Sequence, residues 1–129
     1  MKNITFTLIL MICANYLHAE SYCSNLRAVE SGDAFAYSAS IYVVCEDMSH
    51  ITRTEAEELV ASTLSEYPNI ANEVFIFFVT AKDYFGAMDI EPYNIPKEAY
   101  LADFYNMTNK FVVWPKNKAK QRIIKLADK

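Results

Sequence analysis

The sequence predicts an α+β fold: a small mixed β-sheet in the order β-α-β-β-β, with one amphipathic helix packed on one face and one disulfide. Three observations lead to this prediction. Apolar and polar residues alternate over 34–46, a helical pattern follows, and residues 73–81 are apolar on both faces, as in a strand covered on both sides. A strand, a helix and a buried strand in succession favour a βαβ unit with two parallel strands.

Residues 1–19 have the pattern of a secretory signal peptide. Lys2 provides a positive charge, an apolar run follows over 4–14, and polar character returns at His18. The apolar run is shorter than a bilayer-spanning helix requires, which favours an export signal. The short basic segment is typical of bacterial export. We therefore expect a periplasmic or secreted protein, most simply one of a bacterial envelope.

The small residues near the end of this segment predict the cleavage site. Ala19 is the first choice and Ala14 the second, because small side chains are needed before the cut. Leu17 fits the pattern poorly, so a signal retained as an anchor is an alternative. Cleavage after Ala19 leaves residues 20–129, and these 110 residues are enough for a single exported domain with its own core.

Charge is divided unevenly along this domain. Residues 20–109 contain 15 Asp and Glu against 4 Lys and Arg, whereas residues 110–129 contain 7 Lys and Arg against one Asp. The larger part would repel phosphate, so nucleic acid is not an expected partner. No second apolar stretch in this domain is long enough to cross a membrane.

Cys23 and Cys45 are the two cysteines of this domain, and we expect them to form a disulfide. An isolated pair in an exported protein most simply forms one bridge, and closing a loop of about 22 residues stabilises the fold by roughly 3 kcal/mol. A catalytic or metal-binding thiol pair is the alternative. The spacing is not CxxC and His50 is the only histidine of the domain, so we expect no metal and no cofactor.

The first predicted strand covers residues 34–46 and follows a turn at Gly32 and Asp33. Its alternation predicts one face that meets the core, and Cys45 lies on that face. Cys23 would then tie down the N-terminal arm. The residues of the predicted inward face are Phe35, Tyr37, Ala39, Ile41, Val43 and Cys45.

One helix is predicted after this strand. Thr52 stands three residues before Glu55, and Thr54 three residues before Glu57, so two overlapping capping boxes mark its start. Pro68 ends it. Its apolar stripe, at helical spacing, consists of Ala56, Leu59, Val60, Thr63, Leu64 and Tyr67.

The C-terminal third predicts further strands. Residues 100–115 contain two alternating runs around residues 107–110, which favours an antiparallel hairpin. A helix over 97–106 is the alternative, because Pro96 stands just before its start. Residues 122–126, "RIIKL", indicate a final short strand.

The loop over 82–99 is the first candidate site, because loops of this length in compact domains are usually functional or mobile. Carboxylates beside aromatic rings can bind sugars or carry out acid–base chemistry, whereas the spacing matches no EF-hand loop. The alternative is a loop that packs on the sheet through its aromatic residues and exposes its acids. The candidate residues are Asp83, Tyr84, Asp89, Glu91 and Tyr93.

A basic strip near the C-terminus is the second candidate site. In an extended chain its alternating side chains point to one side and could bind an anionic surface or an acidic protein. Two structural interpretations are favoured: lysines that protect an edge strand from pairing, or a strip that neutralises the acidic helix face. The strip consists of Lys116, Lys118, Lys120 and Arg122.

The usual catalytic motifs are missing from the sequence. No Gly-rich phosphate loop, G-x-S-x-G or H-E-x-x-H motif is present, and His50 is interpreted as a surface residue. Residues 106–108 form a sequon that would accept a glycan only in a eukaryotic protein and is otherwise a turn.

We therefore expect a small exported, non-enzymatic domain: a protein-interaction, inhibitor, immunity-type or envelope accessory module. Its expected partner is a protein in the envelope or outside the cell. A small carbohydrate-binding protein or hydrolase that uses residues 82–99 is the alternative.

Overall fold

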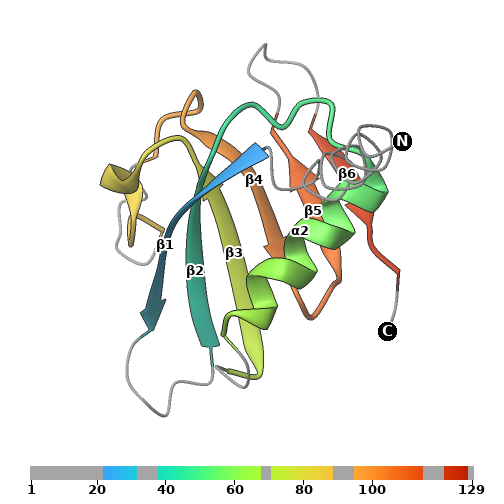
Figure 1. Ribbon diagram of the computed structural model, residues 1–129, viewed down its shortest axis with the longest axis horizontal. Coiled ribbons are helices and arrows are strands. Elements are labelled where there is room, and N and C mark those ends of the chain that lie inside the picture. Colours follow the sequence, from blue (N-terminus) through green and yellow to red (C-terminus); the bar gives the residue numbers. More distant parts are fainter. Residues whose placement is uncertain (1–21, 32–37, 68–70, 89–94, 115–120, 128–129) are drawn as a thin grey trace, which may run out of the picture.

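The computed structural model describes residues 22–31, 38–67, 71–88, 95–114 and 121–127. Within them the chain forms one six-stranded sheet and one α-helix (Figure 1). The strands are β1 (Cys23–Ser31), β2 (Ser38–Cys45), β3 (Glu73–Val79), β4 (Tyr100–Tyr105), β5 (Lys110–Val113) and β6 (Arg122–Lys125). The helix is α2 (Arg53–Ser65), and a short 3-10 turn, η2 (Lys82–Tyr84), follows β3. The predicted signal peptide over 1–19 lies outside the described residues.

The strands lie in the sheet in the order in which they occur along the chain, from β1 at one edge to β6 at the other. The pair β2 and β3 is parallel, and every other neighbouring pair is antiparallel. The helix α2 connects the parallel pair and crosses one face of the sheet (Figure 1). The predicted α+β class, the mixed sheet and the βαβ unit are therefore confirmed.

The six strands differ from the predicted order, which contains four. One addition is β1, whose sequence lacks a clear alternating pattern; its pairing with β2 and its disulfide hold it in the sheet. At the C-terminal end, the predicted hairpin over 100–115 and the predicted final strand are present as β4, β5 and β6, which is one strand more than the order β-α-β-β-β counts. Residues 97–106 contain a strand, as predicted, and not the alternative helix, since β4 occupies Tyr100–Tyr105.

The start of α2 follows one of the two predicted capping boxes. The Glu55 N–H donates to Thr52 Oγ1 at 3.2 Å, and the Thr52 N–H donates to Glu55 Oε1 at 3.0 Å. Thr54 lies inside the first turn, so the second predicted box does not cap the helix. The helix ends at Ser65, three residues before Pro68, and the predicted stripe faces inward: Ala56, Leu59, Val60 and Thr63 are buried.

The core lies between α2 and the sheet. Alternate residues of β2 and β3 point into it, and Cys45 is among them as the sequence predicted. From the other elements, the core includes Leu59 and Val60 of α2 together with Leu101, Phe104, Phe111, Val113 and Ile124. Phe35 and Tyr37, also predicted on the inward face, lie outside the described residues.

The turn between β4 and β5 is hydrogen-bonded to the end of β6. Asn109 has the positive φ of 55° that asparagine tolerates better than most residues. Its N–H donates to the Tyr105 carbonyl at 2.9 Å, and its side-chain amide donates to the Leu126 carbonyl at 3.0 Å. The hairpin turn and the end of β6 are therefore joined through one residue.

Candidate functional site

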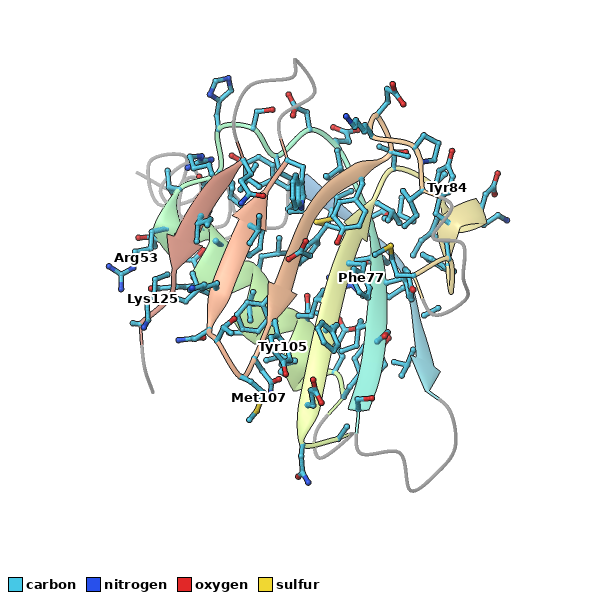
Figure 2. The ribbon with its side chains drawn as sticks, turned by 180° about the vertical axis from the view of Figure 1, so that it is seen from behind. Arg53, Phe77, Tyr84, Tyr105, Met107 and Lys125 are labelled. Carbon is cyan, nitrogen blue, oxygen red and sulfur yellow. A yellow bond between two sulfur atoms is a disulfide. The ribbon has the colours of Figure 1, made fainter. Side chains whose placement is uncertain are left out.

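Among the described residues, most aromatic side chains outside the core lie on the face of the sheet turned away from α2. Figure 2 shows this face, with Phe77 and Tyr105 over the middle of the sheet and the helix behind it. We call it the open face. Its residues on the last four strands, together with Trp114 just after β5, are Phe75, Phe77, Tyr100, Asp103, Tyr105, Lys110, Val112, Trp114, Ile123 and Lys125.

The segment 82–88 covers the part of this face over β2. Gly86 has a φ of 80°, which turns the segment back toward the sheet. The Met88 N–H then donates to the Tyr42 hydroxyl at 2.9 Å, and the Phe85 ring lies 6.0 Å from the Tyr42 ring. Tyr42 is fully buried as a result. Over β2 the sheet is therefore covered on both faces.

The coverage is incomplete at the first half of β3. Phe75 is only partly buried, although Ile76, Phe78 and Val79 are buried. The predicted strand at 73–81 is thus correct in type, but its covering on both sides applies only to its second half. The partly exposed Phe75 lies at one end of a row of aromatic side chains on the open face, which we call the aromatic surface. It consists of Phe75, Phe77, Tyr100, Tyr105 and Trp114.

Phe75 and Tyr105 stack in parallel. They are direct partners on β3 and β4, their ring centroids are 4.3 Å apart, and their planes differ by 2°. The Phe77 ring is nearly parallel to that of Phe75, at 6.0 Å and 4°. Rings stacked across the roughly 4.8 Å spacing of neighbouring strands stand upright on the sheet and present their edges outward. In this pair, one flat face of each ring is therefore covered by the other ring.

Asp103 lies at the centre of a polar cluster on β4. The Tyr100 hydroxyl donates to its Oδ2 at 2.8 Å, and the Trp114 Nε1–H donates to the same oxygen at 3.0 Å. The Tyr100 and Trp114 rings meet edge to face at 6.0 Å. Burial, and after it the Asp103 carboxylate, raise the pKa of Tyr100. The cluster orients Trp114 while leaving 40% of that residue exposed.

Charged residues border the aromatic surface on two sides. The Tyr105 hydroxyl hydrogen-bonds Glu73 at the start of β3. Toward the β6 edge, Lys110 and Lys125 are direct partners on β5 and β6, and both are exposed. Neither ammonium group forms an ion pair with a carboxylate of the described residues. This side of the open face is cationic.

The structure describes only part of the predicted acidic-aromatic loop. Asp83 is exposed on η2 and Tyr84 is half-buried there, at the margin of the sheet in Figure 2. Asp89, Glu91 and Tyr93 lie outside the described residues. The Phe85 ring lies beside the Tyr42 ring of the sheet, a contact of the kind that the structural alternative for this loop predicts.

Of the predicted basic strip, the structure describes Arg122 alone. Its guanidinium donates from Nη2 to the carbonyls of Ser49 and Ile51, both at 2.9 Å. Arg122 thus holds the turn that leads into α2. Lys116, Lys118 and Lys120 lie outside the described residues.

The predicted disulfide between Cys23 and Cys45 is present, and the two residues are direct partners on β1 and β2. His50 is exposed. Among the described residues no group of His, Cys, Asp and Glu has the arrangement of a metal site. In the same residues no helix has the length and apolar character needed to span a membrane.

The sequon residue Asn106 has a structural role. Its Nδ2 donates to the Asn72 carbonyl at 2.8 Å, and its Oδ1 accepts from the Val74 N–H at 2.8 Å. A glycan on Nδ2 would disturb these contacts, which agrees with interpreting residues 106–108 as a turn.

Comparison with protein-family models, with curated proteins and with solved structures gives no match. The aromatic surface of the open face was not among the predicted sites. Its sequence signal is partial: Phe75 and Phe77 stand at alternate positions of 73–79, on the side opposite the core residues. Tyr100 and Tyr105 are five positions apart and share the face only because the register shifts between Phe78 and Val79.

Proposed function

We propose that this chain is a small exported, non-enzymatic protein-interaction domain of the inhibitor, immunity-type or envelope accessory kind, and that the open face is its contact surface. One observation carries the proposal: large apolar side chains remain exposed on a sheet face opposite the core. Trp114 is 40% exposed and Ile123 is 53% exposed, and half-buried Phe75 and Tyr105 lie on the same face.

The composition of this face suits a protein partner. Trp and Tyr are enriched among the residues that dominate binding energy at interfaces, and they are most effective when a polar contact fixes their orientation. Asp103 provides such contacts to Trp114 and Tyr100. Burying such residues gains free energy at about 25 cal/mol per Å² of apolar surface, before the costs of association.

The stacking of Phe75 on Tyr105 favours a protein over a sugar as the ligand of these two rings. A pyranose ring stacks on the flat face of an aromatic ring, but Phe75 and Tyr105 each have one face against the other. Ring edges pack well against aliphatic and aromatic side chains of another protein. The carbohydrate alternative for residues 82–99 gains no support from Asp83 or Tyr84, which the described contacts do not bring together with a second carboxylate.

Site-specific photocrosslinking tests the proposal. A photoreactive phenylalanine analogue is placed at Ile123 on the open face, and in a second variant at Glu58 on the exposed side of α2. Both variants are incubated with extract of the producing cells. We expect a defined protein adduct from position 123 and none from position 58. The same adducts from both positions, or none from 123, would contradict the proposed contact surface.

A matched pair of substitutions supplies a second readout. Ile123→Ser removes an exposed apolar side chain from the open face, and Met107→Ser removes one from the β4–β5 turn, where Met107 is 60% exposed (Figure 2). We expect Ile123→Ser to weaken partner capture by about tenfold and Met107→Ser to leave it unchanged. Equal effects of the two variants would argue against the open face.

A further inference from the structure

We propose that the partner contributes an extended acidic segment that pairs with the outer edge of β6 as a seventh strand. This inference rests on the proposed function and specifies where the partner docks and what chemistry it has. Two independent observations carry it: the direction of the β6 backbone groups and the like-charged pair of lysines beside them.

The register of β6 shows which of its backbone groups point outward. The Leu126 N–H donates to the Asn109 carbonyl at 2.9 Å, in the register that pairs Phe111 with Ile124. Alternate residues of an antiparallel strand exchange hydrogen bonds with one neighbour. Ile124 and Leu126 therefore bond toward β5, while Ile123 and Lys125 direct their N–H and C=O groups to the outer edge. In the described ranges no strand pairs with that edge.

The side chains of the same two residues lie on the open face. Ile123 is exposed beside Val112, and Lys125 lies directly opposite Lys110. Like charges at directly opposed positions of an antiparallel pair destabilise that pair. A carboxylate on an added strand, beside Lys125, would offset this repulsion. An apolar residue two positions away would cover Ile123.

Protection of an edge strand does not explain this arrangement. A lysine on the edge strand itself is sufficient to discourage pairing with other chains, yet Lys110 lies on β5, inside the sheet. The exposed apolar side chain of Ile123 would also favour pairing with another chain, which is the opposite of protection. At the opposite edge, β1 has an irregular register between Cys23 and Arg27, and such irregularities do discourage strand addition.

A second copy of this chain is a poorer occupant than an acidic segment. Pairing two β6 strands would gather Lys110 and Lys125 of both copies on one surface. Four ammonium groups repel one another there, and within the described residues no carboxylate pairs with either lysine. Charge complementarity therefore selects an acidic partner.

The test uses synthetic peptides of about nine residues as probes. The first carries Val and Glu in turn at its even positions and Thr at its odd positions, so that one face alternates an apolar and an acidic side chain. The second replaces each Glu with Lys, and the third has N-methylated backbone amides that prevent strand pairing. Amide hydrogen exchange of the chain is measured by NMR with and without each peptide.

We expect the first peptide alone to slow exchange of the Ile123 and Lys125 amides. The Ile124 amide, which points toward β5, is the internal control and should change little. Binding should weaken as ionic strength rises. The inference is overturned if the first peptide fails to bind, if it binds without protecting these two amides, or if the lysine peptide binds equally well.

Charge reversal provides the matched variants. The double variant Lys110→Glu with Lys125→Glu should lower the affinity for the acidic peptide by at least about tenfold. It should also bind the lysine peptide. Lys82→Glu with Lys97→Glu changes two exposed lysines elsewhere and should alter neither. All four positions are exposed, so the variants should keep their folds, which circular dichroism checks.

Two results separate this inference from the proposed function. If a protein adduct still forms at position 123 after charge reversal at both Lys110 and Lys125, the open face is supported as the contact surface. The same result overturns the inference that an acidic segment pairs with β6. Light scattering that shows a dimer, together with concentration-dependent protection of the Ile123 and Lys125 amides in the chain alone, would assign the edge to a second copy and overturn the acidic partner.

Discussion

Arg27 of β1 donates a hydrogen bond of 2.7 Å from Nη1 to Oε1 of Glu66, the residue that follows the last turn of α2. Side-chain exposure is 10% for Arg27 and 52% for Glu66. The last turn of α2 contains no basic residue, so Arg27 supplies a positive charge near the negative end of the helix dipole. One side chain thus ties the edge strand to the helix.

Removing the two partners of this pair should have unequal effects. Glu66→Gln leaves the buried guanidinium without its carboxylate, and we expect the free energy of unfolding to fall by about 1 kcal/mol after allowance for the exposure of Glu66. Arg27→Met leaves a carboxylate that water can solvate and also removes Arg27 Nε, which has no hydrogen-bond partner in the described structure. Its cost should be smaller. Urea denaturation measures both, and the reverse order would contradict this account.

The cap of α2 allows a comparison of two neighbouring threonines. Thr52→Ala removes the side chain that accepts the Glu55 N–H, so we expect a loss of about 1 kcal/mol in unfolding free energy. Thr54→Ala deletes a threonine within the first turn and should be neutral or slightly stabilising, because alanine has the higher helix propensity. Thermal and urea unfolding of the two variants decide the matter. Equal losses of unfolding free energy in the two variants would contradict the assignment of Thr52 as the N-cap.

The disulfide should stabilise the fold mainly by restricting the unfolded chain. It joins residues 22 positions apart, for which the chain-entropy estimate is about 3 kcal/mol. The double variant Cys23→Ser with Cys45→Ser should therefore unfold at lower urea concentration. Its amide exchange should rise most in β1, which among the described strands pairs with β2 alone. A change within about 0.5 kcal/mol would show that strand pairing alone holds β1.

Tyr100 should make the protein less stable at alkaline pH. Burial and the Asp103 carboxylate raise the pKa of Tyr100 above its ordinary value of 10.0. Above that pH the unfolded chain loses this proton while the folded chain keeps it, so stability falls as pH rises. Tyr100→Phe should reduce this decline by up to about 1.4 kcal/mol per pH unit.

The control for this experiment is Tyr84→Phe, because the Tyr84 hydroxyl has no hydrogen bond to a carboxylate in the part of the chain that the structure describes. Urea unfolding of each protein from about pH 9 to pH 11 gives the slopes. A slope for Tyr100→Phe equal to that of the unmodified chain would contradict the raised pKa of Tyr100.

Local patterns and chain order account for the features that were predicted correctly. The capping box of Thr52 and Glu55 spans four residues, and the stripe of α2 repeats within one element. The parallel pairing of β2 and β3 follows from a strand, a helix and a strand in succession. β1 was missed because its residues carry little alternation, and it is held by a distant cysteine and a neighbouring strand.

By itself the sequence determined the α+β class, the cap and buried stripe of the helix, and the pairing of Cys23 with Cys45. Only the tertiary structure decided the open face and the β6 edge. Phe75 meets Tyr105, and Lys110 meets Lys125, because strand register brings together residues that are 30 and 15 positions apart in the chain. Register depends on how whole strands pack against α2, and a shift of one residue would turn these side chains into the core.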